Sequence, residues 1–204
     1  TFTWWDSNED GYEEHIFRRV RETFYLDQHA HGWTSQTEDT HSIEIWRNSL
    51  HQPHVLRIKV IGLTSWDNNS DGSSDTFNFL SRTWQGSDTN NDGFLDRRVF
   101  HRHYMMQRDD NADGNVAFSV NSNIWHARNL SLSASGTIEV LQEAYLSHNV
   151  ILWNINSQGH AYHTNITWIG FQIDDVAGTT QGITVTAISI DSNQDGTPES
   201  TNYT

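Results

Sequence analysis

Cysteine is absent from the 204 residues of this chain, so neither a disulfide framework nor a thiolate metal site is possible. Lysine occurs once, at Lys59, and the twelve Lys and Arg residues face 26 Asp and Glu residues, which gives a formal net charge of −14. This charge argues against a nucleic-acid partner, because phosphate binding needs clustered cations. The chain also lacks an apolar run long enough to cross a bilayer, so we expect no membrane span.

Alternation of apolar and polar residues, which is typical of strands half buried against a core, dominates two parts of the chain. The first part comprises Ser42–Trp46 and Val55–Ile61. The second part runs from Val116 to Ile190 and contains the segments 117–120, 130–134, 137–141, 150–155, 166–173 and 183–190. Eight strands with short links predict a mainly β fold, an antiparallel β-sandwich or jelly roll.

Four-residue spacing of apolar side chains marks two further segments, Glu13–Leu26 and Arg97–Arg108. In the first, Ile16, Val20 and Phe24 follow this spacing, which fits one face of a helix. We therefore expect one or two short helices beside the strands.

Five copies of the pattern Asp-x-Asn-x-Asp-Gly punctuate the chain, beginning at residues 6, 67, 88, 109 and 191. Oxygen-bearing side chains at alternate positions can converge on one hard cation, and glycine permits the turn that brings the next carbonyl inward. Seventeen of the 26 acidic residues lie in or just after these loops, so the acidity is local. The pattern predicts Ca²⁺ as the cofactor.

The predicted calcium ligands are the side chains at positions one, three and five, the backbone carbonyl at position seven and an acid at position nine. One loop carries Ala117 at the ninth position in place of an acid. The full set is Asp6, Asn8, Asp10, Tyr12, Glu14, Asp67, Asn69, Asp71, Ser73, Asp75, Asp88, Asn90, Asp92, Phe94, Asp96, Asp109, Asn111, Asp113, Asn115, Asp191, Asn193, Asp195, Thr197 and Glu199.

A solvated turn is the plain alternative for any single loop of this kind, because Asp, Asn and Gly favour turns. Repetition of one order of residues favours calcium, and three loops recur at a step of 21 residues from 67 to 109. We expect residues 1–204 to form one β-sandwich domain, with residues 67–116 as a calcium-loop insertion.

These loops resemble three calcium-binding families, the EF-hand, dockerin and thrombospondin type 3 repeats. The stretch 88–114 is most similar to the first two, with apolar Leu95 and Val116 at the eighth position. The resemblance implies calcium binding over residues 67–116. Those families place an acid at the twelfth position, whereas this chain has Phe17, Asn78, Val99, Val120 or Asn202 there. We therefore expect weak sites that act as structural clips.

Four tripeptides match the acceptor for N-glycosylation, at Asn68, Asn129, Asn165 and Asn202. Such tripeptides also arise by chance in a chain rich in Asn, Ser and Thr. Weak calcium sites suit the millimolar calcium found outside cells. We expect an extracellular or cell-surface location.

The nine tryptophans can be interpreted in two ways, as a carbohydrate-binding surface or as core residues, since indole rings stack on sugars but also fill cores. Trp46, Trp153 and Trp168 lie inside apolar strands and fit a core. The better candidates for a binding face lie nearer to turns; they are Trp4, Trp5, Trp33, Trp66, Trp84 and Trp125. The segment 168–175 with 182–191 is similar to the closing strands of jelly-roll carbohydrate-binding modules.

Twelve histidines include the pairs His29-x-His31 and His101-x-His103, which a strand would place on one face. A transition-metal site is one interpretation and scattered surface histidines are the other. Gly-x-Ser-x-Gly, phosphate-cradling and dinucleotide motifs do not occur, and the sequence supports no enzyme activity.

The sequence thus favours a calcium-stabilised extracellular structural or adhesive protein, a glycoprotein that assembles with copies of itself into a surface filament or layer. Short segments at 1–5 and 200–204 can add as strands to the open sheet edge of a neighbour. The alternative is a carbohydrate-binding module or lectin, as part of a secreted glycoside hydrolase, with glycans as partners.

Overall fold

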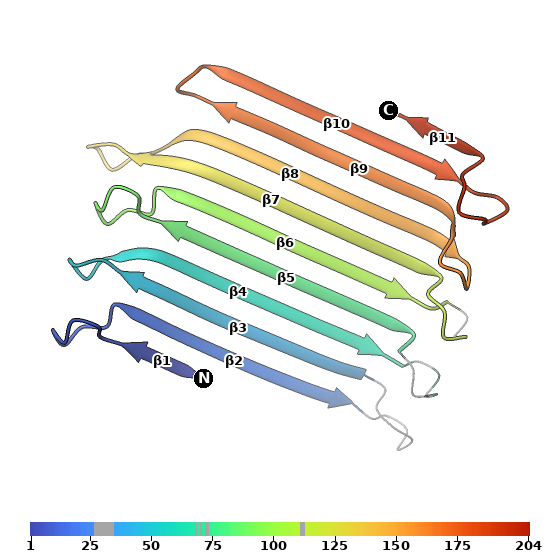
Figure 1. Ribbon diagram of the computed structural model, residues 1–204, viewed down its shortest axis with the longest axis horizontal. Coiled ribbons are helices and arrows are strands. Elements are labelled where there is room, and N and C mark those ends of the chain that lie inside the picture. Colours follow the sequence, from blue (N-terminus) through green and yellow to red (C-terminus); the bar gives the residue numbers. More distant parts are fainter. Residues whose placement is uncertain (27–34, 68, 70, 72–73, 111–112) are drawn as a thin grey trace.

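The computed structural model describes residues 1–26, 35–67, 69, 71, 74–110 and 113–204. These residues form eleven strands in one antiparallel sheet, and each strand pairs with the next along the chain (Figure 1). The strands are β1 (Phe2–Trp5), β2 (His15–Leu26), β3 (Ser35–Arg47), β4 (Pro53–Trp66), β5 (Thr76–Ser87), β6 (Arg97–Arg108), β7 (Phe118–Leu132), β8 (Ile138–Ile155), β9 (Ala161–Asp174), β10 (Thr179–Ile190) and β11 (Ser200–Tyr203). Within the described ranges there is no helix that could cross a membrane.

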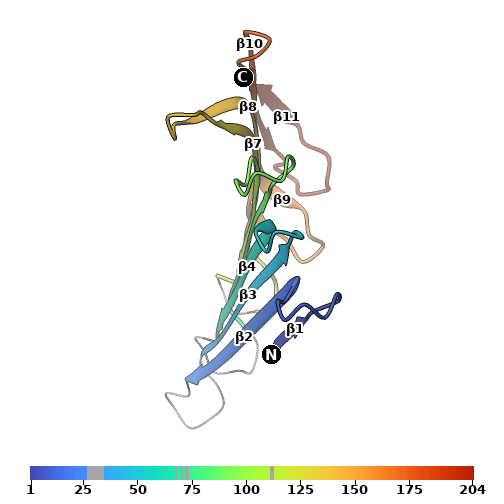
Figure 2. The same cartoon turned by 90° about the vertical axis from the view of Figure 1, so that its left-hand side faces the viewer.

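The sheet is a single layer, seen nearly edge-on in Figure 2. The mainly β, antiparallel class is as predicted, but the two packed sheets of a sandwich or jelly roll are not confirmed. Leu130 is the one buried apolar side chain in the described part of the chain. Most apolar side chains are instead half covered by their cross-strand neighbours on either face. Stability therefore rests on the backbone ladder and on cross-strand pairs more than on a core.

The two predicted helices are wrong, because β2 and β6 occupy those segments. A four-residue spacing is also two periods of a strand, so Ile16, Val20 and Phe24 share one face of β2 as they would share one face of a helix. The segment is also rich in β-branched and aromatic residues, which favours the strand.

Several strands are longer than the alternation of apolar residues indicated. The predicted segments 117–120 and 130–134 both belong to β7, and 137–141 and 150–155 both belong to β8. A sheet that has no buried face accepts polar side chains on both sides. Apolar alternation therefore does not mark where its strands end.

Cross-strand partners lie on the same face of the sheet, and the register defines two faces. On one, Trp84 of β5 pairs with Phe100 of β6, and we call this the Trp84 face. On the other, Trp125 of β7 pairs with Leu146 of β8, and we call this the Trp125 face.

Charge is separated along the strand direction. All twelve Lys and Arg residues lie in strands β2 to β7, whereas most of the 26 acidic residues lie in the connections at the two ends of the strands. The body of the sheet is therefore basic between two acidic rims. Cations bound at the rims would reduce the repulsion within each rim.

All five calcium-type loops are hairpin connections between neighbouring strands. Loops 6–14 and 88–96 lie at one end of the strands, and loops 67–75, 109–117 and 191–199 lie at the other (Figure 1). The 21-residue step is nine loop residues plus one twelve-residue strand. Residues 67–116 supply β5 and β6 with their loops, in the same sheet as the rest; their role as an insertion stays a prediction.

Candidate functional site

Loop 88–96 shows how the repeated sequence builds a closed turn. The Asp88 carboxylate is fully buried and accepts the backbone N–H of Gly93 at 2.8 Å and of Asp92 at 3.3 Å. Gly93 has φ +89°, a backbone conformation that side chains other than glycine rarely adopt. The first Asp and the glycine of the pattern therefore fix the turn together.

Three other loops repeat this arrangement. The glycine N–H donates to the first Asp at 2.8 Å in loop 6–14, at 2.6 Å in loop 109–117 and at 2.8 Å in loop 191–199. In loop 67–75 the glycine lies outside the described residues, and the Asp71 N–H donates to Asp67 at 3.2 Å. Four copies of the sequence pattern thus give one recurring geometry, and the fifth shares the contact to its first Asp.

The acid at position nine closes loops 6–14, 88–96 and 191–199 from the other end. The N–H of Ser7 donates to Glu14 at 2.6 Å, and that of Ser192 donates to Glu199 at 2.6 Å. The Ser192 N–H lowers the pKa of Glu199 by stabilising the charged carboxylate. Ala117 offers no such group, so loop 109–117 lacks this closure.

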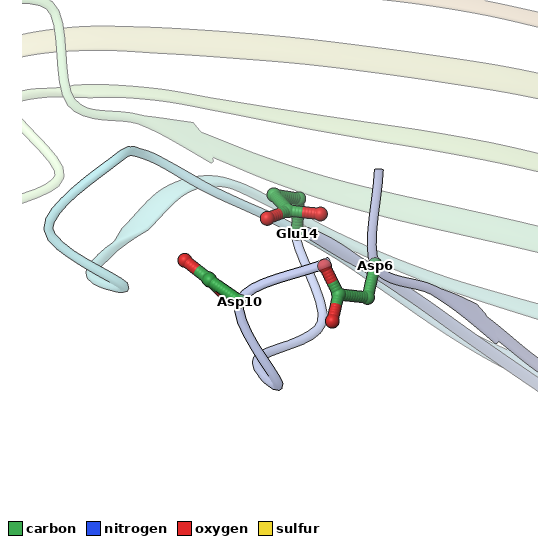
Figure 3. Close-up of side chains that lie close together, drawn as sticks. All are labelled: Asp6, Asp10 and Glu14. Carbon is green, nitrogen blue, oxygen red and sulfur yellow. The ribbon is translucent and has the colours of Figure 1, made fainter. Parts of the chain in front are cut away.

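Loop 6–14 brings three carboxylates together. One oxygen from each of Asp6, Asp10 and Glu14 lies within 4.8 Å of the others, and Figure 3 shows the three side chains around the turn. Asp6 Oδ1 and Glu14 Oε1 are buried and have no hydrogen-bond partner among the described residues. Converging carboxylates repel one another, and a cation between them would offset this repulsion and bind the two oxygens that have no donor. The residues therefore fit a hard divalent cation with oxygen ligands.

Most of the other predicted ligands keep their place in the recurring loop geometry, and their calcium binding stays a prediction. Ser73 and Asn111 lie outside the described residues, as does the predicted glycosylation site Asn68. The acceptors Asn129, Asn165 and Asn202 lie in β7, β9 and β11, and Asn165 is half-buried.

A histidine metal site finds no support in the described ranges, where the only group of three metal-ligating residues is the one in loop 6–14. His29 and His31 lie outside those ranges. His15 is buried instead between the rings of Trp5 at 4.1 Å and Trp46 at 4.7 Å, with Nε2 3.0 Å from Glu44. This cluster holds β1 against β2 and β3.

The tryptophans divide differently from the prediction. Trp168, predicted for the core, is 43% exposed, whereas Trp84, predicted for a binding face, is half-buried. Trp125 is exposed as predicted, and it lines a hollow of about 730 Å³ between the β5–β6 loop and the β7–β8 hairpin. Sequence reasoning missed the rest of that hollow, because its floor comes from two strands whose register only the fold reveals.

Comparison with known proteins adds nothing to this geometry, because no protein-family model, curated protein or solved structure matches the chain.

Proposed function

We propose that this chain is a calcium-stabilised extracellular structural protein whose copies join edge to edge into a continuous sheet, as the subunit of a filament or layer. The observation that carries the proposal is that the strands form one layer in which each strand pairs with the next, joined at both ends by calcium-type loops of recurring geometry.

The outer strands of the sheet are short among the described residues (Figure 1). β1 pairs with β2, up to the pair Thr1–Arg19, and β11 pairs with β10, up to the pair Thr186–Thr204. The outer edges of residues 20–26 and 179–185 are unpaired by the described residues, and unpaired strand edges are templates for pairing with a further strand.

Calcium has a defined place in this assembly. Loop 6–14 follows β1 directly, and loop 191–199 precedes β11, so each short edge strand is anchored by one calcium-type loop. A four-residue strand is a weak element by itself. A cation that stiffens its loop holds the strand in position for the neighbouring copy, and the millimolar calcium outside cells suits weak sites.

Sedimentation velocity and electron microscopy in calcium test the proposal, with thermal unfolding in calcium and in chelator on the same samples. We expect filaments or sheets in calcium, fewer in chelator, and a higher midpoint of unfolding in calcium. A protein that stays monomeric in calcium at every concentration contradicts the assembly, and an unchanged midpoint contradicts calcium binding.

An edge variant shows which contact is responsible. The N–H of Thr180 points to the outer edge of β10, which the described residues leave unpaired there, so Thr180→Pro removes a donor that a neighbouring copy would use. We expect this variant to stay monomeric with an unchanged circular dichroism spectrum, while Thr180→Ala assembles. Assembly of both variants to the same extent contradicts the proposed edge.

A further inference from the structure

A polar hollow opens on the Trp125 face of the sheet. Its volume is about 730 Å³, and it lies between the calcium-type loop 88–96 and the outer part of the β7–β8 hairpin. This size is within the range of small-ligand sites. Figure 2 shows the tip of that hairpin leaving the plane of the sheet. The tip of the β7–β8 hairpin thus forms a wall beside the hollow, on an otherwise single-layered sheet.

Two small side chains make the floor. Ala127 of β7 and Ala144 of β8 are direct cross-strand partners, and the same row continues to Gln172 of β9. The methyl groups of the two alanines rise less far above the sheet than the indole ring of Trp125. The surface is therefore lower along this row, which forms a trough. The exposed ring of Trp125, one position further along the same face of β7, forms its side.

Amide groups form the opposite side. Asn129 donates to Gln142 at 2.8 Å, and Gln142 in turn donates to Asp174 at 3.0 Å, which fixes all three side chains. Asn129 keeps a free carbonyl oxygen in this network. Gln172 makes no side-chain hydrogen bond within the described part of the chain, so its amide offers both a donor and an acceptor to a ligand.

The wall is held in place by the backbone. β7 and β8 change register between Asn129 and Leu130, and such bulges bend a strand pair. Leu130 is buried, and its N–H donates to the Asp96 carbonyl at 2.7 Å. On the other face, Glu143 accepts from Arg128 at 2.7 Å. The hairpin and loop 88–96 therefore form one preformed frame.

We infer that this hollow binds a neutral saccharide, a role that is separate from edge-to-edge assembly and does not depend on it. A sugar ring offers an apolar C–H face and hydroxyl groups that each donate and accept. The Trp125 ring can stack on the C–H face, and the donors and acceptors of Gln172 and Asn129 can form hydrogen bonds with the hydroxyl groups. The two alanines leave room for the ring between them.

Isothermal titration in calcium buffer against neutral hexasaccharides of cellulose, xylan, mannan and chitin tests the inference. We expect at least one of these to bind. The Trp125→Ala variant should bind it about tenfold more weakly, because a ring contact contributes on this order. Ala144→Leu should abolish binding, because its larger side chain fills the trough.

Trp168→Ala is the matched control, because Trp168 is also exposed on this face but stacks on His148 away from the hollow. This variant should bind as the unaltered protein does. The inference is overturned if no neutral hexasaccharide binds, or if Trp125→Ala and Trp168→Ala lose affinity equally. It is also overturned if only oligogalacturonate binds and Arg97→Gln removes that binding, since the ligand is then an anion. Circular dichroism of each variant verifies the fold, and Trp125→Ala remains decisive if Ala144→Leu unfolds.

Discussion

Thr186 in β10 and Thr204 exchange both backbone hydrogen bonds at 2.9 Å, and beyond this pair the outer edge of β10 is unpaired by the described residues. Thr1 and Arg19 form the equivalent pair at the other edge of the sheet, at 2.7 and 2.8 Å. Each pair is the last described backbone pair between a short outer strand and the long strand beside it.

Adding the missing acid at position nine should strengthen calcium binding by loop 109–117. Ala117 stands where the other loops carry an acid, so Ala117→Asp restores the missing carboxylate. We expect one additional or tighter calcium equivalent in a terbium luminescence titration, and a larger rise of the unfolding midpoint with calcium. Ala117→Asn, which has the same shape without the charge, is the control. Equal titrations of all three proteins contradict a calcium role for position nine.

Removal of the first Asp should weaken a loop even without calcium. Asp88 is buried and accepts two backbone N–H groups, so Asp88→Ala leaves the Gly93 N–H without its acceptor and the Asp92 N–H with Asn90 alone. We expect a loss of about 1–3 kcal/mol in the free energy of unfolding in chelator. Urea denaturation measures it, with the exposed Asp110→Ala as the comparison in an adjacent loop. A loss below that of Asp110→Ala contradicts the role assigned to the buried carboxylate.

Leu130 should be the most sensitive apolar position in the described sheet. It is 6% exposed, and Leu130→Ala should cost about 2–5 kcal/mol in the free energy of unfolding. Ile43 is 43% exposed, and Ile43→Ala should cost well under half of that. Urea denaturation compares the two. Equal losses would show that a second layer covers the Trp84 face in solution.

Acid should loosen the β7–β8 hairpin through Glu143. Burial raises the pKa of this carboxyl group, but hydrogen bonds from Arg128 and His126 outweigh burial, and the pKa lies below its ordinary value. The folded state therefore gains stability above the ordinary pKa of a glutamate and loses it as pH falls through the lowered value. Thermal unfolding between about pH 5 and 2 should show this loss, relative to Glu143→Gln, which lacks the titrating group. Parallel pH profiles for the two proteins contradict the assignment.

The strands of β2 and β6 show where local pattern was ambiguous. One face would carry Ile16, Val20 and Phe24 in a helix and in a strand alike. Only the segment that β2 pairs with decides between helix and strand. In the sheet, β2 gains a full ladder with β3, which an isolated helix of this length does not offset. The hollow beside Trp125 could not be predicted from the sequence either. Its floor residues Ala127 and Ala144 lie 17 residues apart and are brought together only by the register of β7 and β8.

The sequence by itself determined the five loops, because the first Asp and the glycine of each pattern act within six neighbouring residues through local hydrogen bonds and a positive φ. It also determined the antiparallel β class, since short turns between alternating segments leave few other pairings. Only the tertiary structure decided that the strands form one layer. Layering and edge pairing depend on which surfaces meet across the whole chain, and local residue order does not carry that information.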